Sequence, residues 1–227
     1  MIVLGLVLLI LWKSRPDYWH HNRQLLAADN ATLQQLASSL EQQMLRDLSG
    51  SPQDTSTTRT LRLSFDQINA WLNVKLEDYL ANRNLKLPRE VSHIMLAGEE
   101  DVLIVAFEYD NGSVSQVMSF RIQPRFATDG RQFQLKLLGV KAGALPLPIK
   151  SLRDRVARQS PQAGQQMDSV LETLDGKWLE AVQFHPGDAR QNLRLTGIRI
   201  NEEGMDLTLQ SEPRPGRESS APPGKLE

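Results

Sequence analysis

The hydrophobic and polar positions of the chain change their spacing several times, and the first change is the largest. Residues 1–12 carry no charge and are almost wholly apolar, after which the sequence turns polar. Twelve helical residues rise about 18 Å, whereas a bilayer core of about 30 Å needs about 20 residues. This length suits a signal peptide, but no small-residue cleavage site follows, and Trp12, Tyr18 and Trp19 suit the headgroup region. We interpret residues 1–17 as an uncleaved single-pass anchor, with a buried core helix as the alternative.

The next segment has the period of an amphipathic helix. Asn30 can act as an N-cap, and apolar residues then recur on one helical face as far as Leu48. Residues 49–58 are rich in Ser, Thr, Pro and Gly, which is typical of a linker. The pattern predicts a juxtamembrane helix at 18–48 that serves as a stalk or clamp, joined by this linker to a main domain at 59–211.

Within the main domain, the periods of strand and helix predict an α+β fold. A short strand leads into Ser64-Phe-Asp-Gln67, a capping box that begins a helix ending near Asn82. Asn111-Gly112 and Asp129-Gly130 are hairpin signals, and the second needs positive φ at its glycine. We therefore expect a twisted antiparallel sheet packed on helices. Its predicted strands are 91–97, 101–109, 114–123 and 133–140.

The C-terminal part of the domain starts with a rigid extended elbow, Leu145-Pro-Leu-Pro148. Helices are predicted at 149–159 and 162–182. A final hairpin then closes the domain, with a β-bulge at Gly197, where the apolar positions change face.

The strand at 102–107 is apolar at every position, which a sheet with one solvated face does not require. Such a strand is either covered on both sides or lines an apolar cavity. We expect a ligand groove between sheet and helix, and its predicted lining is Leu103, Val105, Phe107, Leu145 and Leu147, with Trp71 at the rim.

Composition excludes several classes of function. The net charge of −1 provides no global field to recruit nucleic acid, and the absence of cysteine excludes disulfides and metal-thiolate sites. Neither a nucleophile elbow nor a glycine-rich phosphate loop is present, so we expect no catalytic residue, no cofactor and no enzymatic activity. Residues 212–227 are rich in Pro, Gly and Ser and are predicted to be disordered.

Three polar groups have both a functional and a structural interpretation. His20-His21 would bind metal poorly, because adjacent helical residues point about 100° apart. The Glu99-Glu100-Asp101 turn would suit calcium, but a solvated hairpin tip is the more common arrangement. The 149–159 helix is basic, which favours either contact with anionic headgroups or a solvated face over a core stripe. Its predicted membrane-surface residues are Lys150, Arg153, Arg155 and Arg158.

Three segments carry a family resemblance: the run from Leu63 to Leu72, Ala127 to Gly130, and Gly143 to Pro148. In this order they resemble the YpmS-type family of membrane-anchored bacterial proteins, whose function is uncharacterised. The layout is also similar, more distantly, to the tubular lipid-binding proteins. The resemblance implies an extracytoplasmic main domain and no catalytic residues, whereas basic residues such as Arg15 and Arg23, which follow the apolar run at 1–12, favour a cytoplasmic side.

These features lead to two hypotheses about function. The first is a membrane-tethered, extracytoplasmic, non-enzymatic domain that binds an apolar ligand such as a lipid or another amphiphile. The alternative is an interaction or assembly module of an envelope complex, which would use the helix at 30–48 to bind a protein partner. Neither hypothesis involves nucleic acid.

Overall fold

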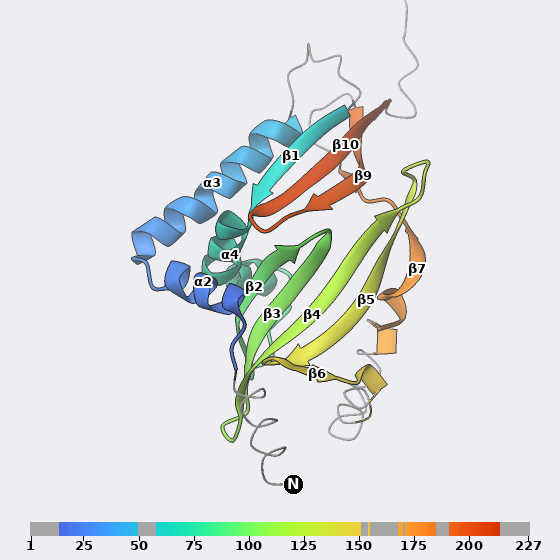
Figure 1. Cartoon of the computed structure of the whole chain (residues 1–227). Coiled ribbons are helices and arrows are strands. Elements are labelled where there is room, and N and C mark those ends of the chain that lie inside the picture. Colours follow the sequence, from blue (N-terminus) through green and yellow to red (C-terminus); the bar gives the residue numbers. More distant parts are fainter. Residues whose placement is uncertain are drawn as a thin grey trace, which may run out of the picture.

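The computed structural model shows an α+β fold made of curled antiparallel sheets and a few helices (Figure 1). It describes residues 14–49, 58–150, 154, 168–169, 171–184 and 191–213. Residues 1–13 of the predicted anchor and most of the predicted linker and tail lie outside this range. Among the described residues, no helix is both long enough and apolar enough to cross a membrane.

Two helices precede the first strand: α2 (Asp17–Leu26) and α3 (Asn30–Ser49). The predicted cap of the second is wrong by one residue, because Asp29 takes this role: its Oδ1 accepts a 2.9 Å hydrogen bond from the backbone of Thr32. The hydrogen bonds from Thr32 lower the pKa of the Asp29 carboxyl. Both helices pack on the main domain, and the apolar face of α3 is buried through Leu33, Ala37 and Leu40.

The predicted helix from Ser64 to Asn82 forms as two helices, α4 (Phe65–Val74) and α5 (Leu76–Ala81). Ser64 caps α4 by accepting a hydrogen bond from the backbone of Asp66. The reciprocal half of the capping box is wrong: the Gln67 amide donates instead to the Ser39 hydroxyl of α3, at 2.9 Å. Tertiary contact with α3 therefore replaces the local bond.

The larger sheet has six strands. Its main path runs in the order β2, β3, β4, β5 and β6, with every neighbouring pair antiparallel, and β7 also pairs with β5. This confirms the predicted neighbours, and Gly130 has the expected positive φ, at 63°. The strands are β2 (Val91–Glu99), β3 (Val102–Asp110), β4 (Ser115–Phe126), β5 (Gln132–Ala142), β6 (Leu145–Leu147) and β7 (Asp175–Glu180).

The smaller sheet, in the order β1, β10, β9 and β8, joins the two ends of the domain. The C-terminal hairpin and its bulge are confirmed, because the register skips Thr196 between Leu195 and Gly197. No pattern in the sequence predicted that β1 pairs with this hairpin to form a separate sheet. The strands are β1 (Thr58–Ser64), β8 (Gln183–Phe184), β9 (Gln191–Ile200) and β10 (Gly204–Pro213).

The helix predicted to reach Val182 is wrong beyond residue 174. Residues 175–180 form β7, in which Trp178 and Leu179 lie opposite Gln134 and Phe133 of β5. Gly176 has φ of 82°, which a right-handed helix does not allow. The period of the apolar residues favoured a helix, but pairing with the edge of β5 satisfies the backbone in an extended conformation.

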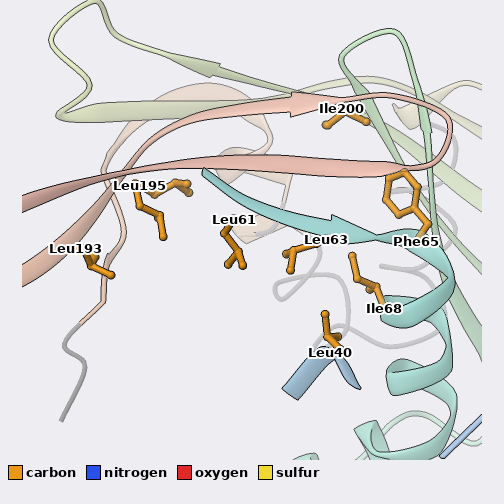
Figure 2. Close-up of a cluster of buried hydrophobic side chains, with 9 residues drawn as sticks. Leu40, Leu61, Leu63, Phe65, Ile68, Leu193, Leu195 and Ile200 are labelled. Carbon is orange, nitrogen blue, oxygen red and sulfur yellow. The ribbon is translucent and has the colours of Figure 1, made fainter. Parts of the chain in front are cut away.

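The main core lies between the smaller sheet and helices α3 and α4, as Figure 2 shows. It is continuous with the sheet junction, where Gly98 of β2 approaches the turn after β9. A Cβ at Gly98 would lie 2.1 Å from the Asn201 carbonyl oxygen, so only glycine allows this approach. The buried residues of this core are Leu40, Leu61, Leu63, Phe65, Ile68, Leu193, Leu195, Ile200 and Leu209.

Candidate functional site

One side of the six-stranded sheet, called here the apolar face, carries the predicted lining residues of the β-strands. Val105 lies opposite Phe120 of β4, and the same row continues through Val140 to Leu147. Side chains directly opposite one another in antiparallel strands share a face. The neighbouring rows add Leu103 with Ile122 and Leu137, and Phe107 with Met118, Ala142 and Leu145.

The structure therefore brings five of the six predicted lining residues to one surface. Leu103 packs against the main core, whereas Phe107 stacks on Phe120 with ring centroids 6.0 Å apart. All five are partly exposed, although Val140 and Ala142 between them are buried. The surface is thus continuous and hydrophobic, and its outer side chains retain some contact with solvent.

Trp71, the predicted rim residue, belongs to a different contact. It lies on α4, where its Nε1 donates a 2.9 Å hydrogen bond to Glu41 of α3. Its ring meets that of Tyr79 edge-on, with centroids 5.7 Å apart. These contacts position the ring among the helices, so it is not grouped with the five strand residues.

The opposite side of the six-stranded sheet, the covered face, packs against α2. Trp19 is fully buried and contacts Met95, Ile104, Ala106 and Val117. Tyr18 lies beside this cluster: burial raises the pKa of its hydroxyl, and a hydrogen bond with Ser119 acts in the opposite direction. This side is a closed hydrophobic contact between helix and sheet.

Two polar side chains in that contact have no hydrogen-bond partner. The Nε1 of the Trp19 indole is unpaired, and so are the oxygen and the nitrogen of the Asn22 side-chain amide. Asn22 is only 1% exposed. Buried polar groups are normally paired, so α2 is held on the sheet at an energetic cost.

Charged groups at one end of the covered face offset part of this cost. The side chain of Glu108 is only 13% exposed. Its carboxylate lies 3.4 Å from the Arg15 guanidinium and 3.7 Å from that of Arg23. The Nδ1 atom of His93 also lies 3.2 Å from the Glu108 carboxylate. Its φ of 50° falls within a break in the register of β2, and this bulge directs the ring toward Glu108. Sequence reasoning missed this cluster, because Arg15 and Glu108 are 93 positions apart.

The remaining polar candidates are largely engaged in local contacts. His21 pairs with Asp66 at 3.2 Å, and Glu99 pairs with Arg121 at 2.8 Å. The backbone of Asp101 donates to the Ile200 carbonyl, so the acidic turn contacts β9. In the part of the chain that the structure describes, no three His, Asp or Glu side chains are grouped to hold a metal ion.

Of the predicted membrane-surface residues, only Lys150 is described, and it is exposed. The other three, Arg153, Arg155 and Arg158, lie outside the described residues.

Comparison of the chain with protein-family models, curated proteins and solved structures finds no match.

Proposed function

We propose that this chain is a membrane-tethered, extracytoplasmic, non-enzymatic domain that binds a lipid or another amphiphile on its apolar face. The observation that supports the proposal is the exposure along β3. Ile104 and Ala106 are buried under α2, whereas the alternating residues Val105 and Phe107 remain partly exposed among other apolar side chains. Close-packed interiors do not leave such a surface, and apolar surfaces of this kind are typical of ligand sites.

The anchor is part of the proposal. It relies on the uncharged run at residues 1–12 and on the resemblance to the YpmS-type family, which also provides the preferred orientation. A reporter fused after Glu227 that is active only outside the cytoplasm tests this orientation. Activity of a cytoplasm-only reporter at the same position would contradict it.

The alternative hypothesis, an assembly module, needs a free apolar face on α3. Leu33, Ala37 and Leu40 are instead buried within the chain, and Leu45 is the large apolar side chain of α3 that stays exposed, at 68%. A partner would have to bind through the outer side of this helix. The structure therefore favours ligand binding over assembly through α3.

The direct test is binding of a fluorescent fatty acid to the full chain in lipid nanodiscs, with the empty nanodisc as background. Val105→Asp should weaken binding about tenfold, which corresponds to about 1.4 kcal/mol, because it places a carboxylate against the acyl chain. Leu45→Asp is the matched control, since it adds the same charge at an exposed leucine away from the apolar face. A wild-type chain that binds no amphiphile, or equal effects of the two variants, would overturn the proposal.

A further inference from the structure

One end of the six-stranded sheet, called here the entry end, collects three segments that are distant in sequence. Arg15, near the start of the described chain, pairs with Glu108 of β3. The backbone of Asp110, just before the β3–β4 turn, donates a 2.8 Å hydrogen bond to the Glu90 carbonyl, at the close of the loop 82–90. Figure 1 shows the dark blue beginning of the described chain beside the end of the sheet that carries this turn.

The direction of α4 brings the loop 82–90 to this end. Asn69 hydrogen-bonds the backbone of Leu96, and Asn73, one turn later, bonds the carbonyl of Ile94. The helix therefore runs antiparallel to β2, and α5 continues toward the start of that strand. The loop between α5 and β2 consequently lies at the entry end.

This loop, called here the basic loop, has the sequence Asn-Arg-Asn-Leu-Lys-Leu-Pro-Arg-Glu. Leu85 is 55% exposed, and it lies between the exposed basic residues Arg83, Lys86 and Arg89. Glu90 is the single acidic residue of the loop, and the two acidic residues of α5, Glu77 and Asp78, lie in the first turn of that helix. An exposed leucine among basic side chains suits an anionic lipid surface.

The loop is held in a defined conformation. The backbone of Leu85 donates a 2.9 Å hydrogen bond to the Leu80 carbonyl, and Asn84 adopts the left-handed conformation with φ of 57°. The Arg83 guanidinium lies over the Tyr79 ring, 4.6 Å from its centroid. Presentation of the leucine therefore requires little further ordering on binding.

The length of the tether brings this surface close to the membrane. Arg15 lies three residues after Trp12, and three extended residues span at most about 11 Å. Headgroup charge acts over a Debye length of about 8–10 Å. With the apolar run at 1–12 held in the membrane, the start of the entry end at Arg15 lies at about the distance over which anionic headgroups attract basic side chains.

We infer that the basic loop docks the domain on the anionic surface of the membrane that holds its anchor, with Leu85 entering the headgroup layer and Arg83, Lys86 and Arg89 contacting lipid phosphates. This inference rests on the proposed anchor. It assigns the entry end to the membrane and leaves the apolar face on the side of the sheet, where ligand can reach it.

The absence of cysteine permits a clean test by single-cysteine labelling of the full chain. Leu85→Cys is labelled with a polarity-sensitive fluorophore and reconstituted into vesicles with headgroup-proximal spin-labelled lipid as quencher. Leu45→Cys is the matched control, because Leu45 is also an exposed leucine, at 68%. It lies on α3 beside the smaller sheet, where nearby Gln43 donates a hydrogen bond to the carbonyl of Arg62. Vesicles are made with phosphatidylcholine alone or with added phosphatidylglycerol.

The expected result is quenching at position 85 that is severalfold stronger than at position 45, that increases with phosphatidylglycerol, and that falls when Arg83, Lys86 and Arg89 are changed to Gln. Equal quenching at the two positions, or no dependence on phosphatidylglycerol, would overturn the inference.

Flotation of the vesicles separates the two proposals: a chain that does not float contradicts the anchor, whereas a chain that floats with no quenching at 85 contradicts docking alone. The label at 85 can also be shielded from aqueous iodide in native membranes but remain accessible in vesicles that contain the labelled chain and no other protein. That result would identify a protein partner and would also overturn the inference.

Discussion

The two faces of the six-stranded sheet are built from the same strands but differ in what covers them. On the covered face, Ile104 is 2% exposed and Ala106 is fully buried beneath Trp19 of α2. On the apolar face, Val105 and Phe107 alternate with these residues and remain partly exposed. Hydrophobicity is therefore similar on the two sides, and the difference arises from a helix that lies about 80 positions earlier in the chain.

The covered face is closed despite an imperfect fit. Asn22 and the Trp19 indole are buried without hydrogen-bond partners, and the ion pairs of Glu108 hold the helix at one end. A closed face can thus contain polar groups that cost stability, because the burial of Trp19 outweighs them. The apolar face has a more uniform lining but is less completely covered, which is the arrangement expected of a binding surface.

The largest expected effect comes from a carboxylate on each face. Ile104→Asp would bury an unpaired charge and should cost about 4–5 kcal/mol of unfolding free energy, enough to unfold most small domains. Val105→Asp should cost only about 1–2 kcal/mol, because water can reach the carboxylate on a partly exposed surface. Urea denaturation of the full chain in detergent measures both. Equal losses would mean that the two faces are equally sealed.

Removing the covering side chain tests the closed contact. Trp19→Ala should lower the free energy of unfolding by about 3–5 kcal/mol, as expected for loss of a buried tryptophan. Trp178→Ala, at a half-exposed position of β7, should change it by about 0.5 kcal/mol or less. Comparable losses in the two variants would show that α2 is not seated on the sheet as described.

A substitution of Gly98 tests the close approach between the two sheets, at the edge where the apolar face meets the smaller sheet. Gly98→Ala should cost about 1–3 kcal/mol, because its Cβ would overlap the Asn201 carbonyl and force the two sheets apart. Gly139→Ala in β5 is the control, since its Cβ would meet no atom within 4 Å. Thermal unfolding of both variants checks this, and a neutral Gly98→Ala would contradict the close junction.

The smallest effect should be a gain. Asn22→Leu removes two unpaired polar atoms and should stabilise the chain by about 1 kcal/mol. Asn69→Leu is a matched contrast at another buried asparagine, and it should be destabilising by about 2 kcal/mol, because Asn69 bonds both the N–H and the carbonyl of Leu96. Chemical denaturation distinguishes the signs, and destabilisation by Asn22→Leu would indicate that Asn22 has a partner after all.

Some elements were predictable because their signals are local. The turn at Gly130 needs positive φ, which glycine provides at little cost, and the structure has it. The change of face near Gly197 predicted the bulge. The hairpin signal at Asn111-Gly112 predicted the pairing of β3 with β4. Leu145 and Leu147 were predicted only as part of an extended elbow, and the structure pairs them with β5 as strand β6 of the same sheet. The candidate site was accessible to this extent, since alternation determines which side chains share a face.

The sequence by itself therefore determined the turns, the periods and the set of apolar side chains, because each depends on residues within a few positions of one another. Tertiary structure alone decided that residues 175–180 pair with β5 instead of extending a helix, and that β1 joins the C-terminal hairpin. It also decided that Trp19 covers one face while Val105 stays partly exposed on the other. These outcomes depend on contacts between segments far apart in the chain, whose packing and hydrogen bonding outweigh local preference.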